Sequence, residues 1–132
     1  MTTLLLLNKE EALEFTREKT VEAAIKRCND AGAKYVCVTD GKRGVLASDG
    51  KNLWHCPVLS GIKIIDTTGA GDAFGSGATW ALLRGFGLPD ALKAGTLNAA
   101  GVVSAIGAQA GLLTEEAMNQ ALKNSNLTIT QR

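Results

Sequence analysis

The first forty residues alternate between segments with a strand-like pattern and segments with a helical pattern of apolar positions. Residues 3–7 form an apolar run, and residues 9–19 carry apolar side chains among charges, as an amphipathic helix does. Residues 21–30 show a second helical face that ends before Gly32, and residues 35–39 form a short run rich in β-branched side chains. This alternation of strand and helix predicts an α/β fold with a largely parallel sheet.

Short strands and a turn are expected between residues 40 and 55. Segments 44–47 and 52–55 flank the sequence Ser48-Asp49-Gly50-Lys51, which is typical of a hairpin turn, so we expect antiparallel strands there. A further apolar run at residues 62–65 predicts another strand, which leads into a glycine-rich turn.

Helical patterns dominate the rest of the chain. One helix is expected from about residue 71 to residue 84, where two glycines follow and end it. The next, from Pro89 to about residue 106, is apolar on nearly all sides and is expected to be a buried central helix. A last amphipathic helix is expected over residues 114–122, and residues 124–132 are expected to form a frayed tail.

Composition narrows the classes of function. The chain has 132 residues, of which 45% are apolar and 20% charged, so it can bury the core of one globular domain. Fourteen basic residues against thirteen acidic residues give a net charge of +1, which supplies no field for holding nucleic acid or an anionic membrane. The leucine run at residues 4–7 is too short to span a membrane. The expected partner is therefore a small molecule.

Several reactive or bulky side chains lack any partner in the sequence pattern. The three cysteines are odd in number and have no metal-site spacing, which favours reduced thiols and a cytoplasmic protein. We expect Trp54 and His55 to finish a strand near the surface and Trp80 to pack its helix. The cysteines are Cys28, Cys37 and Cys56.

Residues 66–74, Asp-Thr-Thr-Gly-Ala-Gly-Asp-Ala-Phe, carry the clearest chemical signal. Gly69 and Gly71 follow a predicted strand and precede a predicted helix, so unpaired backbone N–H groups there favour an anion such as phosphate. A carboxylate at Asp72 repels bound phosphate unless it is needed beside the transferring group. General-base catalysis is such a need, because Asp72 would accept the proton of an attacking hydroxyl group. The alternative is a structural turn with Asp72 as a helix-start residue.

Two other nucleotide-binding motifs fit the chain less well. A Walker A loop requires Gly-x-x-x-x-Gly-Lys-Ser/Thr, which the sequence lacks. A dinucleotide fingerprint requires Gly-x-Gly-x-x-Gly, but its third glycine position is Phe74. Its acidic residue would be Asp90, which follows Gly87-Leu88-Pro89, a sequence that cannot form a central strand. Both motifs are therefore disfavoured.

Residues 66–74, together with the small-residue segment 75–78, closely resemble the C-terminal signature of the pfkB (ribokinase-like) carbohydrate kinases. The resemblance implies a three-layer α/β/α sandwich and transfer of the ATP γ-phosphoryl group to a hydroxyl of a sugar, sugar phosphate or nucleoside. It also implies that Asp72 is the catalytic base, and that Gly69, Ala70 and Gly71 supply the anion hole.

Asn8-Lys9-Glu10-Glu11 resembles the Asn-x-x-Glu motif of the same family. The resemblance implies that Asn8 and Glu11 help to arrange Mg²⁺, its waters and the triphosphate, so that Glu11 acts on the metal indirectly. The alternative is a capping box, because a strand-to-helix junction often carries Asn at the N-cap and Glu three residues later.

The segment Thr39-Asp40-Gly41-Lys42-Arg43-Gly44 resembles the nucleotide loop Thr-x-Gly-x-x-Gly of the family. The resemblance implies that Thr39, Gly41 and Gly44 lie along ATP, whereas the alternative is an ordinary turn. Asn98 stands where the family often has a polar residue beside the adenine, and the alternative there is a satisfied buried amide.

A monovalent cation is a further implication of the resemblance. Residues 104–109 resemble the loop that, in many members, helps to bind such a cation together with Asp66 and Thr68. Backbone carbonyls provide much of that binding, and they do not depend on residue type. The sequence therefore leaves open whether potassium is bound.

The resemblance implies that residues 1–132 are the C-terminal part of one pfkB-type kinase domain, without the N-terminal portion that holds substrate and lid. The favoured hypothesis is an ATP-dependent kinase that acts on a sugar or sugar phosphate. A nucleoside kinase of the same family and a non-catalytic nucleotide-binding remnant remain open, as does a homodimer. The sequence does not indicate the identity of the phosphate acceptor.

Overall fold

The computed structural model describes residues 4–57, 70–99, 119, 122–123 and 127–132. The chain folds as two compact units. The sheet unit comprises Met1–Val58 and Thr128–Arg132, and the helical unit comprises Leu59–Leu127. No helix among the described residues is long and apolar enough to cross a membrane.

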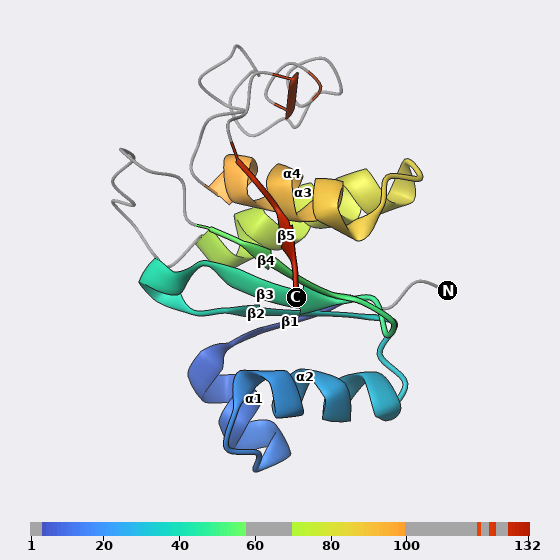
Figure 1. The fold of residues 1–132 in the computed structure, drawn as a ribbon. Helices are drawn as coiled ribbons and strands as arrows, with labels where there is room; N and C mark the ends of the chain where they lie inside the picture. Colours follow the sequence, from blue (N-terminus) through green and yellow to red (C-terminus); the bar gives the residue numbers. More distant parts are fainter. Residues whose placement is uncertain (1–3, 58–69, 100–118, 120–121, 124–126) are drawn as a thin grey trace. The chain divides into compact units, whose positions relative to one another are not determined.

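A five-stranded sheet with the strand order β1-β2-β3-β4-β5 forms the centre of the sheet unit (Figure 1). β1 and β2 are parallel, and each of the remaining neighbours is antiparallel. The strands are β1 (Leu4–Asn8), β2 (Tyr35–Thr39), β3 (Val45–Ser48), β4 (Leu53–Cys56) and β5 (Thr130–Gln131).

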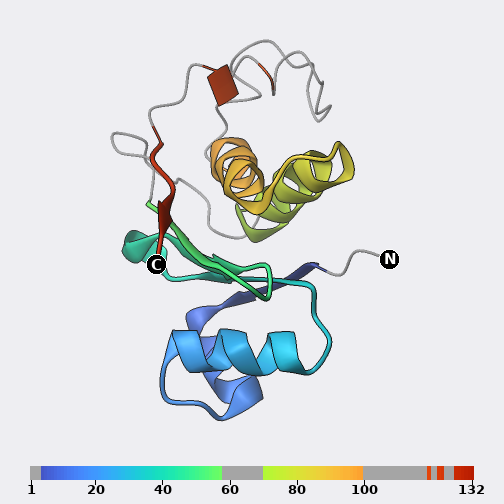
Figure 2. The ribbon, with the colours of Figure 1, turned by 45° about the vertical axis from the view of Figure 1, so that its right-hand side comes forward.

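Two helices, α1 (Lys9–Thr16) and α2 (Val21–Asp30), lie on the same face of this sheet in both views (Figures 1 and 2). Their small and branched residues pack against alternate residues of β2, because successive strand side chains point to opposite faces. This core removes apolar surface from water, at roughly 25 cal/mol per Å². Its buried members are Ala12, Ala24, Ile25, Cys28, Val36 and Val38.

The described part of the sheet is mixed: β1 and β2 are parallel and the β3–β4 hairpin is antiparallel, both as predicted, and β2 also pairs antiparallel with β3. The reason is the length of the connections: β1 reaches β2 through two helices, whereas β2, β3 and β4 follow one another through short loops. Short loops only permit antiparallel neighbours. The predicted strand at residues 62–65 lies outside the described residues.

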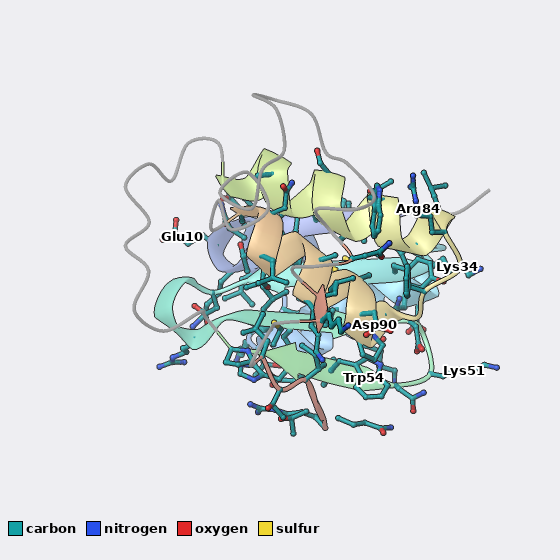
Figure 3. All side chains as sticks on the ribbon, turned by 90° about the horizontal axis from the view of Figure 1, so that it is seen from above. Glu10, Lys34, Lys51, Trp54, Arg84 and Asp90 are labelled. Carbon is teal, nitrogen blue, oxygen red and sulfur yellow. The ribbon has the colours of Figure 1, made fainter. Side chains whose placement is uncertain are left out.

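The predicted hairpin is confirmed between β3 and β4. The Asp49 side chain organises its turn, because Oδ1 accepts hydrogen bonds from the backbone N–H groups of Lys51 (2.9 Å) and Asn52 (2.7 Å). Gly50 has φ +91°, which glycine adopts without steric cost. Lys51 extends from the tip of this turn (Figure 3).

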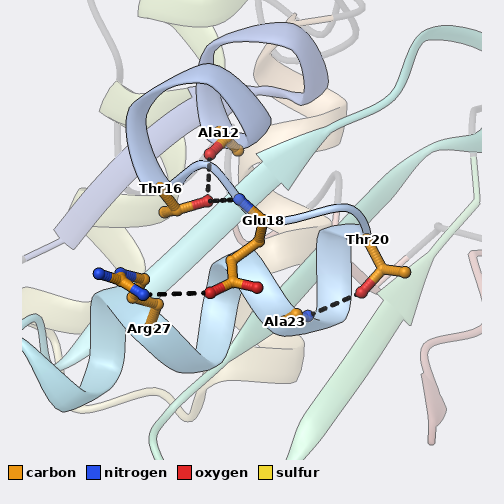
Figure 4. Close-up of polar contacts among 6 residues, drawn as sticks. All are labelled: Ala12, Thr16, Glu18, Thr20, Ala23 and Arg27. Carbon is orange, nitrogen blue, oxygen red and sulfur yellow. Dashed lines mark hydrogen bonds and ion pairs between the residues drawn. The ribbon is translucent and has the colours of Figure 1, made fainter.

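The link between α1 and α2 is held by side-chain hydrogen bonds (Figure 4). Thr16 Oγ1 donates to the Ala12 carbonyl (2.7 Å) and accepts from the Glu18 N–H (3.2 Å). Arg17 follows in the left-handed region with φ 59°, so α1 ends at Thr16, three residues before the predicted end. Thr20 then caps α2, since its hydroxyl accepts from the Ala23 N–H (3.2 Å).

The end of the chain is a strand rather than the frayed tail that the sequence predicts. Thr130 and Gln131 pair with His55 and Trp54 of β4, and the Arg132 N–H donates to the Leu53 carbonyl (2.8 Å). Backbone groups along the edge of β4 are thereby paired, which stabilises the segment. Two residues are too few to show a strand pattern in the sequence.

The helical unit contains two helices, α3 (Ala70–Leu83) and α4 (Leu88–Ala99), which lie side by side (Figure 2). The predicted stop after α3 is confirmed, because Gly85 has φ +85° and the Phe86 N–H donates to the Ala81 carbonyl (3.1 Å). Trp80 is buried and stacks on Phe86 with ring centroids 6.1 Å apart, as expected for a packing residue.

The apolar character predicted for α4 is confirmed as far as Ala99, and residues 100–106 lie outside the described part. Asp90 is exposed at the start of the helix. The expected last helix at residues 114–122 also falls almost entirely outside the described residues. The buried residues of α4 are Leu88, Ala91, Leu92, Ala94, Gly95 and Leu97.

Two glycines allow α3 and α4 to approach closely. A Cβ at Gly77 would lie 2.6 Å from the Ala94 carbonyl oxygen. A Cβ at Gly95 would lie 2.8 Å from both the Phe74 carbonyl oxygen and the Phe74 ring. Contacts this short cannot be relieved by moving a flexible side chain alone, because backbone atoms are involved.

Gly95→Ala is therefore expected to destabilise the protein by roughly 1–2 kcal/mol, because overpacking outweighs the gain of about 1 kcal/mol in helix propensity. Urea unfolding of the full-length protein measures this change. Ser76→Ala, at an exposed position of α3, is the control and should change stability by less than about 0.5 kcal/mol. Equal stability of the Gly95 variant and the wild type would contradict the close packing.

Candidate functional site

The parallel pairing of β1 and β2 brings two predicted site segments to one edge of the sheet. In the register of this pair, Asn8 lies opposite Thr39, and both residues end their strands. Glu11 follows in the first turn of α1, and Gly41 and Gly44 follow β2. The structure therefore places five of the predicted binding residues at the carboxyl edge of the sheet unit.

Asn8 and Glu11 form a complete capping box at the start of α1. Asn8 Oδ1 accepts from the Glu11 N–H (2.8 Å), and Glu11 Oε1 accepts from the Asn8 N–H (3.0 Å). The capping interpretation is confirmed. Asn8 Nδ2 and Glu11 Oε2 take no part in these two bonds, so the same side chains retain polar atoms for a ligand. Their role towards magnesium and triphosphate stays a prediction.

Residues 40–44, which we call the 40–44 loop, connect β2 to β3 and contain a single turn of 3₁₀ helix, η1 (Gly41–Arg43). The loop closes on itself: the Asp40 N–H donates to the Gly44 carbonyl (2.8 Å), and the Arg43 N–H donates to the Asp40 carbonyl (2.8 Å). Gly44 has φ +87°, and a Cβ there would collide with the Cys56 carbonyl oxygen. Glycine at this position is thus required by both conformation and space.

His55 contacts this loop from β4. Its Nε2 lies 2.6 Å from the Arg43 carbonyl oxygen, and its side chain is half-buried. The sequence predicts only that His55 lies at the end of a strand near the surface. No sequence signal identifies the contact, because the partner is a backbone carbonyl 12 residues away.

A pocket of about 330 Å³ lies beside the 40–44 loop, with all of its lining residues in the sheet unit. Four cationic and two anionic side chains line it, together with His55. Within the described residues, none of these six charged groups is within ion-pair distance of an opposite charge. The positive excess favours an anionic ligand. The charged lining residues are Lys9, Lys19, Glu22, Asp40, Arg43 and Arg132.

The predicted anion hole belongs to the helical unit. Asp66, Thr68 and Gly69 lie outside the described residues. Ala70, Gly71 and Asp72 form the first turn of α3, which confirms a helix that begins at the glycine-rich turn. Asp72 is the third residue of this helix. The assignments of base, anion hole and cation site stay predictions.

Asn98 links the two helices of the helical unit. Its Nδ2 donates to the Ala73 carbonyl of α3 (2.7 Å), and its side chain is half-buried. The interpretation as a satisfied amide is confirmed, and the contact with adenine stays a prediction. Because Ala73 directly follows Asp72, this hydrogen bond also braces the first turn of α3.

The described part of the chain contains neither a reactive thiol nor a cluster of metal-binding side chains. The described residues contain no group of three or more His, Cys, Asp or Glu side chains that could hold a metal ion. All three cysteines belong to the described part of the chain, are buried and form no disulfide bond. Burial raises the pKa of Cys37 to about 12 and also raises the pKa of Cys28, so both thiols are protonated near neutral pH and are weak nucleophiles.

Comparison with known proteins identifies relatives of one kind. The sequence model of the family described as "pfkB family carbohydrate kinase" matches residues 1–115. An ATP-dependent 6-phosphofructokinase of Thermoanaerobacterium thermosaccharolyticum is 36% identical over 88 residues, covering 67% of this chain and 27% of the relative. A cytidine kinase of Thermococcus kodakarensis is 38% identical over 91 residues, covering 67% of this chain and 32% of the relative.

Solved structures share the fold. The crystal structure of a ribokinase from Thermotoga maritima superposes with a TM-score of 0.72 at 34% identity, covering 92% of this chain and 42% of that protein. The fold is therefore ribokinase-like. The chain spans only 27% to 44% of the length of the first curated relatives that it matches.

Gly44→Ala is expected to lower the free energy of unfolding by roughly 2–4 kcal/mol, because backbone strain at positive φ and collision with the Cys56 carbonyl add together. Gly50→Ala is the matched control. Gly50 has φ +91° but no atom within 4 Å of an added Cβ, so only the strain of roughly 1–2 kcal/mol remains. Denaturant unfolding measures both, and equal losses would show that the 40–44 loop is not packed on β4.

Proposed function

Because this chain belongs to the pfkB family of carbohydrate kinases, we propose that the protein transfers the γ-phosphoryl group of ATP to a hydroxyl group of a small-molecule acceptor. The observation that carries the proposal is the match of the family over residues 1–115, which includes the Asp66–Phe74 signature. The edge shared by Asn8 and the 40–44 loop supports it, since two segments that the family uses for the nucleotide lie together there.

ATP would bind along the carboxyl edge of β1 and β2. Thr39 offers a hydroxyl group there, Gly41 has nothing within 4 Å of an added Cβ and so leaves the backbone open to a ligand, and Gly44 sets the path of the loop beside it. The uncompensated cations of the neighbouring pocket suit a polyphosphate. A helix or loop at the carboxyl ends of parallel strands is also the usual place for ligands in α/β proteins.

The proposed chemistry centres on Asp72. Its carboxylate would accept the proton of the acceptor hydroxyl while that oxygen forms a bond to the γ-phosphorus and the bond from phosphorus to the ADP oxygen breaks. The backbone N–H groups of Gly69, Ala70 and Gly71 would hold the negative charge of the group in transfer. General-base assistance of this kind is worth roughly 10²–10⁴-fold in rate.

Magnesium fits the residues at the carboxyl edge. Mg²⁺ usually keeps several waters and is bound by one or two carboxylates plus substrate phosphates, so it does not need a cage of protein ligands. Glu11 has an oxygen outside the capping box, and it can hold a metal-bound water while Oε1 keeps the helix start in place. When bound, Mg²⁺ neutralises charge on the phosphate oxygens.

Potassium is proposed as an activator bound at Asp66, Thr68 and the 104–109 loop. Oxygen ligands at a turn next to the anion hole would fix the backbone whose N–H groups hold the phosphoryl charge. A dependence of the turnover rate on K⁺, with Na⁺ as the control, tests this part separately. A cytoplasmic location is also proposed, because none of the three cysteines, all of them in the described residues, forms a disulfide bond.

A sugar or a sugar phosphate is the favoured acceptor, because the matched relatives include a 6-phosphofructokinase and a ribokinase. A nucleoside is the second candidate, and the specific observation in its favour is the 38% identity to a cytidine kinase. A panel of sugars, sugar acids, sugar phosphates and nucleosides, each with ATP and Mg²⁺, separates the two candidates.

Asp72→Asn should lower kcat by roughly 10²-fold or more, since the amide cannot accept the proton. The measurement is ADP formation by the full-length protein with its best acceptor. Asp90→Asn is the matched control, because Asp90 is an exposed acid in the first turn of the neighbouring helix (Figure 3), and it should leave kcat unchanged. An Asp72→Asn variant with wild-type turnover would refute the base assignment.

Glu11→Gln separates the capping role from the metal role. Glutamine preserves the acceptor of the capping box, so thermal stability should change little, whereas the loss of charge should raise the Mg²⁺ concentration for half-maximal activity several-fold. Glu10→Gln removes an equivalent exposed charge from the same first turn of α1 and serves as the control. If both variants show the same Mg²⁺ dependence as the wild type, Glu11 is only a cap.

A further inference from the structure

We propose that His55 is a positioning residue for ATP, because it holds the 40–44 loop in its binding conformation through the Arg43 carbonyl. This inference rests on the proposed function, which supplies the role of the loop in nucleotide binding. It adds a residue that belongs to none of the motif segments and that does not itself need to touch the nucleotide.

The hydrogen bond has only one chemically allowed direction. A carbonyl oxygen can accept but not donate, so the 2.6 Å separation between His55 Nε2 and the Arg43 oxygen requires a proton on Nε2. The imidazole is therefore the donor, through Nε2–H, and the Arg43 carbonyl is the acceptor.

His55 lies on a strand that is paired with a neighbour on each side. β4 is paired on both sides, and in its register His55 lies between Leu46 of β3 and Thr130 of β5. The imidazole is half-buried, and this limits its freedom to rotate. A side chain on a paired strand positions its partner more accurately than one on a loop.

The bond acts at the point where the loop returns to the sheet. Arg43 ends η1, and its carbonyl shares a peptide plane with the Gly44 N–H, which donates to the Gly41 carbonyl (3.2 Å). Because the peptide is planar, fixing the Arg43 oxygen also fixes the direction of this N–H group. The hydrogen bond from the Gly44 N–H to the Gly41 carbonyl, which closes the loop, thus depends on the orientation of the Arg43–Gly44 peptide, and His55 fixes that orientation.

Few other interactions from outside hold the loop. Among the described side chains outside the loop, His55 is the one that makes a hydrogen bond to residues 40, 41, 43 or 44. The second anchor is steric, since Gly44 packs directly on the Cys56 carbonyl next to His55. Both anchors come from the end of β4, so this strand holds the loop without contributing to its sequence motif.

Loss of the donor is expected to weaken ATP binding rather than the chemical step. An unanchored loop must be ordered when ATP binds, and that cost appears in the apparent affinity for ATP. His55→Phe keeps a ring of similar size without the N–H group and should raise the KM for ATP by roughly three- to tenfold, with little change in kcat. His55→Gln places an amide N–H near the position of Nε2 and should restore the KM to near the wild-type value.

The steady-state test uses the full-length protein with its best acceptor. Thr130→Ala is the control, because Thr130 is exposed and lies opposite His55 on the adjoining strand, so its removal perturbs the same part of the sheet without touching the loop. An unchanged KM for ATP in His55→Phe would overturn the proposal. A His55→Gln variant as impaired as His55→Phe would overturn it too, since the donor would then not be the essential group.

Amide hydrogen exchange of the ligand-free protein gives a readout that does not depend on catalysis. We expect faster exchange at Gly44 in His55→Phe, and wild-type exchange in His55→Gln and Thr130→Ala. A raised KM without faster exchange would overturn the positioning role, because His55 would then contact ATP directly. If the wild type lacks kinase activity, the proposed function fails, while the exchange measurement still decides whether His55 holds the loop.

Discussion

Parallel pairing of β1 with β2 is the constraint on which the rest of the sheet unit depends. It places the ends of two strands at one edge, so that Asn8 and Thr39 become neighbours although 31 positions separate them in the sequence. A parallel neighbour needs a long crossover, and α1 and α2 supply it while covering one face of the sheet. The helices that build the core therefore also create the edge at which a ligand can bind.

A structural role and the proposed ligand-binding role coincide at this edge. The Asn8 and Glu11 side chains satisfy the backbone at the start of α1, which is a stabilising role that needs no ligand. The same bonds hold both side chains in one orientation. A carboxylate that is already fixed by a cap loses little conformational entropy when it binds a hydrated metal ion. Capping and metal binding are thus compatible at these two residues.

The 40–44 loop shows how a short motif depends on residues outside it. Its two glycines at positive φ set the path of the chain, but the place of that path relative to the sheet comes from the end of β4. Gly44 meets the Cys56 carbonyl, and the Arg43 carbonyl meets His55. The sequence motif therefore includes the residues of the loop but not the residues of β4 that hold it in place.

The sequence was sufficient for elements with a strong local pattern. β2 and α2 have the predicted limits. The hairpin turn at Asp49 and the end of α3 at Gly85 were also predictable, because Asp and Gly are the residue types that favour such turns. β5 could not be predicted, because a two-residue strand is defined by its partner and not by its own pattern. The antiparallel pairing of β2 with β3 has no signal in the strand residues for a related reason, since strand direction is a property of the connection.

Some residues of the candidate site were likewise predictable from the sequence, and others were not. Motif residues that project from strand ends, such as Asn8 and Thr39, were found from the sequence and meet in the structure. His55 was not found, because its partner is a backbone oxygen, which every residue type carries. The sequence does not predict the pocket, since its charged residues come from α1, the α1–α2 link, the start of α2, the 40–44 loop and the end of the chain.

The central claim is that ATP binds at the carboxyl edge formed by β1 and β2. An amide NMR titration of the full-length protein with a non-hydrolysable ATP analogue in the presence of Mg²⁺ tests it most directly. The largest shifts in the sheet unit should occur at residues 8–11 and 39–44, with much smaller shifts at the opposite end of the sheet around residues 49–52. Saturable binding of the analogue that leaves residues 8–11 and 39–44 unshifted would contradict the claim.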